Sequence, residues 1–391
     1  MGKLISYLWN RFRQGDMVLL LLCLVTTAFG CLILSSTTAY MGQQSRNIIV
    51  QIASAFIGIA AYAVFSSIDA EFFSEHRGLL TAFTIFLLAL LIPFGTDNGT
   101  GNKSWLAIPG LPFDIQPAEI CKIFYILVSA SVMAAHQNRP SHITAVGHRA
   151  FHLLLVVGMN MALSRDAGVS LIFVFIFIGM AFAGGISLFW FMIGGAALAV
   201  GAPILWSMMD GYQRNRIQVL FDPSLDPLGR DVRYHTVNSL KSLTGGGIAG
   251  QGLYQGHRTQ QGALFAQHTD FVFSSIGEEL GFIGCMFTIV LILLIIIRCV
   301  WVGNRSTDYM RKLICYGAAS ALMFQMIVNI GMCIGIMPVI GLTLPFMSYG
   351  GSSLVTLYAM VGLVSGVYAR PDAPSHQRYI RPPNYSRFEL H

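Results

Sequence analysis

Charged residues are scarce in this sequence. Only 11% of the 391 residues are Asp, Glu, Lys or Arg, whereas 54% are hydrophobic. Soluble globular domains carry roughly a quarter charged residues, because their surfaces face water. The scarcity of charge therefore excludes an ordinary water-soluble domain. It also argues against nucleic acid as a partner, since the net charge of +6 has no soluble face on which to gather.

Paired cysteines are also missing. The seven cysteines are odd in number, lie in or beside apolar runs and show no Cys-x-x-Cys spacing. Neither a disulfide framework nor a zinc site is indicated by such a pattern. We interpret these cysteines as small apolar packing residues.

Long uninterrupted apolar runs are abundant. A membrane-spanning helix needs about 20 mainly apolar residues to cross roughly 30 Å of hydrocarbon, whereas the strands of a membrane barrel alternate in short segments. The fold class predicted is therefore all-α integral membrane, with about ten transmembrane helices. The expected spans are Met17–Ser35, Ile48–Phe65, Leu79–Phe94, Ile115–Ala135, Phe151–Leu163, Val169–Ala183, Ser187–Trp206, Phe271–Ile297, Leu313–Ile336 and Ser352–Val367.

Three of these runs, the first, the fifth and the sixth, differ from ordinary spans. The first follows Lys3, Arg11 and Arg13, as in a signal peptide, but it is longer than a usual signal core and lacks a clean cleavage site. We expect it to be retained as the first span. The fifth and sixth runs are short and are separated only by residues 164–168, so the count can differ by one.

Lys and Arg near the span ends predict the orientation, because cytoplasmic loops carry an excess of them. With a cytoplasmic N-terminus, the short loops on the outer side hold only Arg46, Lys103 and Arg165. We therefore expect a multi-pass membrane protein with both termini in the cytoplasm. The basic residues on the cytoplasmic side are Lys3, Arg11, Arg13, Arg77, Arg139, Arg149, Arg298, Arg305, Arg311, Lys312, Arg370, Arg378, Arg381 and Arg387.

One long polar segment, residues 208–270, lies between the seventh and eighth spans and is predicted to be external. Connections of this length are usually functional or disordered. Its apolar residues favour an ordered loop anchored on the bundle: Leu220, Phe221, Leu225, Val232, Tyr234, Leu240, Leu253, Tyr254, Leu264 and Phe265. We divide the chain into a membrane domain, residues 1–370, and a Pro-rich cytoplasmic tail, residues 371–391, which its composition predicts to be disordered.

Ionisable residues at membrane depth are costly, so they indicate function or internal pairing. In Gln116-Pro117-Ala118-Glu119 and Lys122, Pro117 fits the first turn of a helix, and Glu119 and Lys122 then share one face. Two interpretations stay open, with about equal weight. The pair is either a buried ion pair that fixes helix packing or a charge pair that faces a polar cavity.

Three further places carry carboxylates. Arg165-Asp166 is best interpreted as an interfacial loop pair, and a functional role is the alternative. Asp270 lies where the long loop enters the eighth span, which favours a helix N-cap. A second role, compatible with the first, is a base whose pKa is raised by partial desolvation. Glu278 and Glu279 lie about two turns into that span, point in different directions and are expected to have partners.

The stretch from Gly245 to Gly252 is rich in glycine. It lacks the Gly-Lys-Ser/Thr of a Walker loop, so an ATP site is not indicated. A solvated flexible loop is the simpler interpretation. The alternative is a cradle for an external anionic group, with the basic residues of the loop nearby: Arg214, Arg216, Arg230, Arg233, Lys241 and Arg258.

Several motifs occur together in one order along nearly the whole chain. They are Gln116-Pro117-Ala118-Glu119 with Lys122, Asp222-Pro223 through Asp226-Pro227-Leu228-Gly229, His268-Thr269-Asp270-Phe271, Gly277-Glu278-Glu279-Leu280-Gly281 and Pro345-Phe346-Met347-Ser348-Tyr349-Gly350-Gly351-Ser352-Ser353. In these residues the chain resembles the SEDS family of shape, elongation, division and sporulation proteins, which includes RodA, FtsW and SpoVE.

The resemblance implies a peptidoglycan glycosyltransferase of the bacterial cytoplasmic membrane, which polymerises lipid II into glycan strands on its outer face. It also implies a class B penicillin-binding protein as the partner that crosslinks these strands. It implies Asp270 as the catalytic general base. Supporting residues of the substrate cavity are then expected within the matched motifs: Glu119, Lys122, His268, Thr269, Glu278, Ser348, Gly350 and Ser352.

The chemistry agrees with this implication. A lipid diphosphate is a good leaving group, so one carboxylate that takes the proton of the attacking sugar hydroxyl suffices, and single displacement inverts the anomeric centre. The diphosphate needs positive charge, from Arg214, Arg216, Lys241 or Arg258 or from a divalent cation such as Mg²⁺ or Mn²⁺.

Two stretches depart from the family pattern. Phe265-Ala266 stands where Pro-Glu is usual, and Ser164-Arg165-Asp166-Ala167-Gly168 stands where a Gln-Pro-Asp-Leu-Gly-like motif is usual. These departures affect accessory contacts and not Asp270 itself. The rival functions are a transporter that flips lipid II and a non-catalytic scaffold of the cell-wall machinery. The position of Asp270 at the outer edge favours the polymerase.

Overall fold

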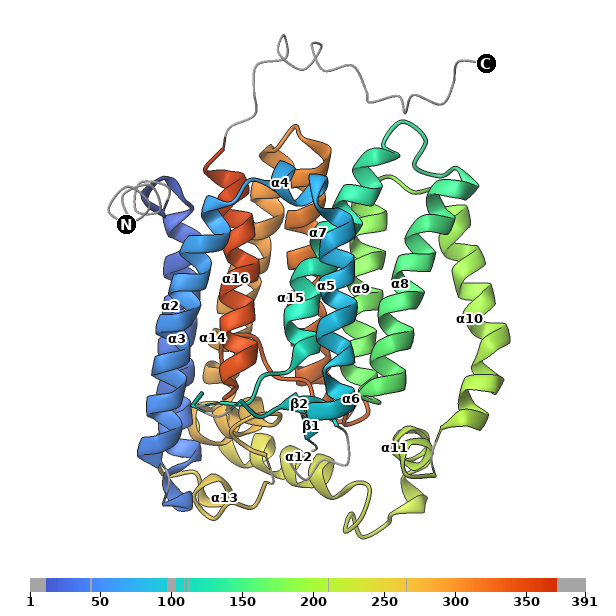
Figure 1. The fold of residues 1–391 in the computed structure, drawn as a ribbon. Coiled ribbons are helices and arrows are strands. Elements are labelled where there is room, and N and C mark those ends of the chain that lie inside the picture. The colour runs from blue at the N-terminus through green and yellow to red at the C-terminus, as the bar shows by residue number, and fades with distance from the viewer. Residues whose placement is uncertain are drawn as a thin grey trace, which may run out of the picture.

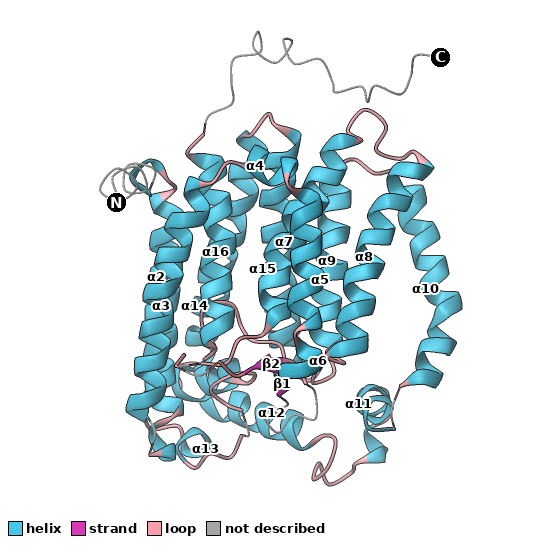
Figure 2. Ribbon diagram, viewed as in Figure 1, coloured by secondary structure: helices cyan, strands magenta, loops and turns pink. Residues whose placement is uncertain are grey.

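The computed structural model describes residues 12–42, 44–96, 103–108, 110–111, 113–209, 211–264 and 266–370. The predicted tail, residues 371–391, and Phe265 lie outside the described residues. Within these ranges most of the chain is helical, and loops and one pair of short strands connect the helices (Figure 2). The elements up to the seventh expected span are α2 (Met17–Thr37), η1 (Ala39–Met41), α3 (Gln44–Ser67), α4 (Ala70–Glu75), α5 (Arg77–Ala89), α6 (Leu91–Phe94), β1 (Gly95–Thr96), β2 (Trp105–Leu106), α7 (Pro117–Ala135), α8 (Ile143–Leu163), α9 (Ala167–Ala183) and α10 (Leu188–Met208).

The remaining elements comprise the long loop and the last three spans. They are α11 (Gly211–Phe221), η2 (Pro223–Leu225), α12 (Tyr234–Gly246), α13 (His257–Gln260), α14 (Val272–Arg305), α15 (Tyr309–Cys333) and α16 (Gly351–Tyr368). Strands β1 and β2 pair antiparallel in two residues only. The all-α membrane fold predicted from the sequence is confirmed.

Eight described helices are long and apolar enough to cross a membrane, namely α2, α3, α5 with α6, α7, α8, α14, α15 and α16. Two shorter apolar helices, Ala167–Ala183 and Leu188–Ile204, follow α8. The expected boundaries differ in two places. Helix α8 begins at Ile143 and not at Phe151, because its polar first turns continue the helix. The third expected span is interrupted at Leu90, which divides α5 from α6.

The bundle has two distinct ends (Figure 1). Helices α11, α12 and α13 lie at the lower end, which we call the loop face, and α2 begins and α16 ends at the upper end, which we call the opposite face. Close packing of α16 on α3 forms part of the core. A side chain at Gly362 would clash with the backbone of Tyr62, and one at Gly58 would clash with the ring of Tyr358.

Helix α10 stands apart at the edge of the bundle (Figure 1). Every residue from Met192 to Val200 is exposed, whereas α7 and α16 are buried along most of their length. A helix that is apolar on all sides and has little protein around it is suited to a lipid environment. Helix α10 therefore contributes little to the core of the described bundle.

The long loop is ordered, as its apolar content predicted, but not all of the expected anchors are buried. Leu264 is buried, and Leu243 and Leu253 pack against the core. In contrast, Phe221 is 86% exposed and Leu225 is 56% exposed, so the prediction that they anchor the loop is wrong. The loop is held mainly by its second half.

The second half of the loop is hydrogen-bonded to α14 at a point where that helix is broken. Gly281 has φ +67° and ψ −162°, a conformation open essentially to glycine alone. Backbone hydrogen bonds join the two segments there: Gln251 N–H donates to the Glu278 carbonyl (3.0 Å), Gly252 N–H to that of Glu279 (2.9 Å) and Phe282 N–H to that of Gly247 (2.9 Å).

Glycine is required on both sides of this contact. A side chain on Gly250 would lie 2.2 Å from the Glu279 carbonyl oxygen, and one on Gly281 would lie 2.3 Å from the Gly250 nitrogen. The stretch from Gly245 to Gly252 is thus neither a solvated flexible loop nor an exposed anion cradle. Both sequence interpretations of it are corrected, because its backbone groups are used in binding α14.

Candidate active site

Asp270 lies on a tight turn that leads into α14. The carbonyl of Ala266 accepts three backbone N–H groups, from Thr269 (3.1 Å), Asp270 (3.0 Å) and Phe271 (3.2 Å). Helix α14 begins at Val272, and no side chain caps its N-terminus. The N-cap interpretation of Asp270 is therefore wrong, because its carboxylate does not cap the start of the helix.

Segments from the rest of the bundle hold this turn. Tyr349 N–H donates to the His268 carbonyl (2.9 Å), and the Ser348 hydroxyl donates to the Thr269 carbonyl. Gln51 of α3 continues the chain of contacts, since it donates to the Ser348 carbonyl (3.1 Å) and accepts from Gly350 N–H (3.3 Å). Gln51 was not predicted from the sequence, because an isolated amide in an apolar run carries no signal of its own.

The surroundings of the Asp270 carboxyl are unfavourable to its charge. The residue is half-buried, and burial raises its pKa to about 6. The Thr269 hydroxyl lowers the pKa, the charge of Asp166 raises it and the charge of Arg216 lowers it. A carboxylate poised near neutral pH can accept a proton in one step and release it to water in the next.

Glu119 and Lys122 form a buried ion pair, as their spacing predicted. Pro117 begins α7, and Lys122 Nζ lies 2.8 Å from Glu119 Oε1. The two residues are 4% and 3% exposed, respectively. The hydroxyl of Thr356 on α16 donates to Glu119 Oε2 (3.2 Å). Each charge is thus compensated inside the protein, and the pair joins α7 to α16.

Asp166 joins the same region. Its Oδ1 caps α9 by accepting Val169 N–H (3.0 Å), and its Oδ2 accepts from Gln116 Nε2 (3.0 Å). Arg165 is exposed and has a left-handed φ of +54°. The interpretation as an Arg165–Asp166 pair is therefore wrong. Burial raises the pKa of Asp166.

Helix α16 completes the group at its first turn. The Ser352 hydroxyl accepts Gln116 N–H (3.2 Å), which fixes the start of α7 against α16. Of the supporting residues expected from the sequence, four belong to the hydrogen-bonded turn around Asp270: His268, Thr269, Ser348 and Gly350. Glu119, Lys122 and Ser352 belong to a second network between α7 and α16, which is related to Asp270 through the charge of Asp166.

Glu278 is not among them. It is fully buried, and its carboxylate accepts the N–H groups of Arg258 (2.8 Å) and Thr259 (2.9 Å) and the Thr259 hydroxyl (2.7 Å). Eight helical residues separate it from Asp270, about 12 Å along the axis. Glu278 therefore binds the loop to α14, and its expected place in the substrate cavity is corrected. Glu279 accepts from Ser36 and Gln260 in the same way.

The four expected diphosphate contacts are dispersed. Arg216 is the one that acts on Asp270, and its Nη1 donates to the Val339 carbonyl (2.7 Å). Arg214 donates to the Ser207 carbonyl (2.7 Å), and Arg258 donates to Asn238. Lys241 is exposed on α12. Of the four, Arg216 is therefore the residue whose charge affects the pKa of the candidate base.

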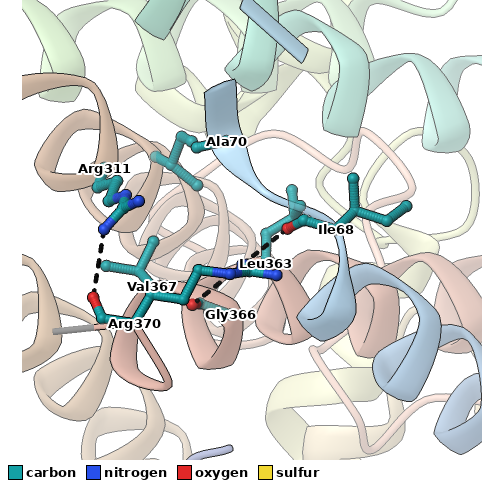
Figure 3. Close-up of a pocket in the computed structure, with 8 residues that line it drawn as sticks. Ile68, Ala70, Arg311, Leu363, Gly366, Val367 and Arg370 are labelled. Carbon is teal, nitrogen blue, oxygen red and sulfur yellow. Dashed lines mark hydrogen bonds between the residues drawn. The ribbon is translucent and has the colours of Figure 1, made fainter. Parts of the chain in front are cut away.

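A small cavity lies at the opposite face, away from this group (Figure 3). Its two arginines are already engaged. Arg370 Nη1 donates to the Ile68 carbonyl (2.8 Å), Arg311 Nη1 donates to the Arg370 carbonyl (3.2 Å), and both guanidinium groups pair with Asp69. This cavity fixes the end of α16 and is not the candidate active site.

The structure thus defines a multi-pass helical membrane protein with one polar site at the loop face, built from the turn around Asp270 and the first turns of α7, α9 and α16. The family model for the FtsW, RodA and SpoVE proteins, described as "Cell cycle protein", matches residues 16–371. The chain belongs to this family.

Individual relatives agree. The peptidoglycan glycosyltransferase MrdB of Escherichia coli is 32% identical over 363 residues, which cover 92% of this chain and 95% of that protein. The probable peptidoglycan glycosyltransferase FtsW of Geobacter metallireducens is 30% identical, with coverage of 92% and 96%.

Solved structures share the fold. A structure that concerns the structural coordination of polymerization and crosslinking by a peptidoglycan synthase complex contains a chain with a TM-score of 0.76 and 27% identity, with coverage of 94% of this chain and 99% of that one. The crystal structure of the rod shape determining protein RodA of Thermus thermophilus gives a TM-score of 0.67 at 25% identity, covering 92% and 98%.

Proposed function

We propose that this protein is a peptidoglycan glycosyltransferase that polymerises lipid II, with Asp270 as the general base. The family and the names of its relatives support the activity. One observation carries the assignment of the base. Asp270 presents a half-buried carboxylate with a pKa near 6 at the loop face, on a turn whose backbone is hydrogen-bonded to the rest of the protein.

In the proposed reaction the hydroxyl of the acceptor sugar attacks the anomeric carbon of the donor. The new C–O bond forms as the bond to the lipid diphosphate breaks, and the diphosphate leaves with the electron pair. Asp270 takes the hydroxyl proton and later releases it to water. Since the leaving group is already a stable anion, no general acid is required, and the anomeric configuration inverts.

Positive charge near the diphosphate comes from Arg216 in this proposal, since Lys122 is already neutralised by Glu119. Among the described residues, no group of three or more His, Cys, Asp or Glu side chains could hold a metal ion. The donor set therefore does not fit a resident cation. A Mg²⁺ or Mn²⁺ ion would have to arrive with the substrate phosphates, and we assign no step to it.

The proposed setting follows from the orientation predicted by the basic residues. The loop face lies outside the cytoplasmic membrane, both termini lie in the cytoplasm, and the lipid tail of the substrate stays in the bilayer. A class B penicillin-binding protein is the proposed partner, which would crosslink the strands made here. The similar chain in the peptidoglycan synthase complex, where polymerization and crosslinking are coordinated, supports that pairing.

The test is Asp270→Asn in purified protein supplied with labelled lipid II. The change keeps the size of the side chain and removes the basic oxygen, so polymerisation should fall by about a hundredfold or more, the usual contribution of a positioned base. Lipid II binding should survive. Asp231→Asn, at an exposed carboxylate of the same loop, is the matched control and should remain active. Near wild-type polymerisation by Asp270→Asn would refute Asp270 as the base. Absence of polymerisation by the wild-type protein would instead favour the transporter or scaffold function.

A further inference from the structure

Three consecutive carbonyl groups hold the turn that carries Asp270. Those of His268 and Thr269 accept from Tyr349 and Ser348, as described above. The third, of Asp270 itself, accepts from the side-chain nitrogen of Asn329 on α15 (2.8 Å). The first two donors come from one loop, whereas Asn329 comes from a membrane-spanning helix. It therefore links the candidate base to the bundle core, and the Cys333 thiol of the same helix makes a longer contact with the same carbonyl (3.8 Å).

Asn329 makes a second hydrogen bond with the same nitrogen, to the carbonyl of Leu342 (2.6 Å). The residue is 0% exposed, and its Oδ1 has no hydrogen-bond partner in the described structure. The two carbonyls settle the orientation of the amide, because an oxygen in the place of the nitrogen would face two other oxygens. An unpaired buried acceptor costs free energy. The favourable hydrogen bonds of this side chain are thus the two that join Asp270 to Leu342.

The neighbour of Leu342 lies beside the candidate base. Gly341 has a left-handed φ of +71°, and a β-carbon on it would lie 3.5 Å from Asp270 Oδ2. The position of the carboxylate over Gly341 therefore depends on how the backbone of Asp270 sits against residues 341–342. Asn329 is the side chain that bridges these two backbones.

We propose that Asn329 is a positioning residue, which fixes the height and direction of the Asp270 carboxylate by bridging the carbonyls of Asp270 and Leu342. The proposal rests on the proposed function of Asp270. Displacement of a catalytic group by about 1 Å costs on the order of a hundredfold in rate, even when the substrate binds as before. Loss of the bridge should therefore act on turnover and not on binding.

The first experiment compares Asn329→Leu with Gln325→Leu. Gln325 is a buried amide one turn away on the same helix and has no described contact with Asp270, so it controls for the loss of any buried amide from α15. With lipid II as substrate, Asn329→Leu should lower kcat by about tenfold to a hundredfold while KM changes less than about twofold. Gln325→Leu should keep the wild-type kcat.

A pH profile separates positioning from a merely structural role. A loosened turn lets water reach the carboxyl, and burial is the main cause of its raised pKa. The acid limb of kcat/KM should therefore move to lower pH in Asn329→Leu and stay in place in Gln325→Leu. The other charged or titratable groups near Asp270 are the same in both variants, namely Asp166, Arg216, Cys333 and the sequence neighbour His268.

A third variant guards against misfolding. Asn329→Ser keeps a hydroxyl that can donate to one carbonyl, and its kcat should lie between those of the wild type and Asn329→Leu. Folded Asn329→Leu and Asn329→Ser proteins that both keep kcat within twofold of the wild type would overturn the positioning role. If Asn329→Leu does not fold, Asn329→Ser decides alone by the same criterion. An active Asp270→Asn protein would instead refute the proposed function, so the two failures are distinguishable.

Discussion

At the scale of single residues, the protonation of Asp270 should determine how activity depends on pH. Its pKa of about 6 exceeds the ordinary value near 4, because burial disfavours the charged form. A base must be ionised to work. We therefore expect kcat/KM for lipid II to rise with pH through about 6 and to level above 7. A profile flat between pH 5 and 7 would contradict this.

The raised pKa of Asp270 also predicts how the stability of the protein depends on pH. The folded state holds the Asp270 proton more tightly than the unfolded chain does, so this residue's contribution is fully present below pH 4 and is lost as pH rises through about 6. At pH 7.5 the ionised carboxylate is a net cost. Asp270→Asn should therefore have a Tm equal to or above that of the wild type, measured in detergent. A lower Tm would mean that the carboxylate is structural.

The Glu119–Lys122 pair gives the opposite expectation. With both residues nearly fully buried and 2.8 Å apart, removal of one partner strands a charge, at a cost of roughly 3–5 kcal/mol. Glu119→Ala and Lys122→Ala should each destabilise the protein strongly, and the double variant should cost less than their sum. The measurement is a double-mutant cycle of unfolding free energies, and strict additivity would count against the contact.

At the scale of elements, the break in α14 couples the loop to the membrane helix. Gly281→Ala would place a β-carbon 2.3 Å from the Gly250 nitrogen, in a conformation that alanine avoids. We expect a lower Tm and rapid proteolysis between Gly245 and Gly252, together with loss of polymerisation. Gly195→Ala on α10, where a β-carbon meets open space, is the control and should be neutral.

The wild-type loop should resist protease at that stretch, because its backbone is hydrogen-bonded to α14. The exposed turn around Ser224 and Leu225 should be cut first instead. Peptide mapping of partial digests checks the order. Cleavage at an engineered site between Gly245 and Gly252 should abolish polymerisation while the bundle stays assembled, and full activity after such a cut would reduce the loop to a connector.

At the scale of the whole molecule, orientation is testable by labelling. A cysteine introduced at Ser224 on the loop face should react with a membrane-impermeant maleimide in intact cells, and one at Asn138 on the opposite face should react only after permeabilisation. Both positions are exposed, and most native cysteines are buried. Labelling of the Asn138→Cys variant in intact cells would contradict the orientation predicted from the basic residues.

How much of this architecture is predictable from the sequence depends on the range of the interaction. Apolar runs predict spans because each run must cross the same hydrocarbon thickness, and the Glu119–Lys122 pair follows from helical spacing. The break at Gly281 and the bonds of Asn329 were not predictable. They join segments far apart in the chain through backbone groups, which leave no mark on composition or periodicity.

The break in α14 also sets a vertical scale. Residues Val272 to Glu279 are buried in protein, and the first strongly exposed apolar side chains of this helix are Phe282 and Ile283. Between Asp270 and Phe282 lies the helical segment Val272 to Leu280, roughly 13 Å long, which ends at the break at Gly281. If the bilayer begins at Phe282, the buried segment sets the distance between the membrane surface and Asp270, the proposed base. One helical turn added to this segment would move Asp270 about 5.4 Å farther from the membrane. It would then lie beyond the reach of the proposed donor, which its lipid holds in the bilayer.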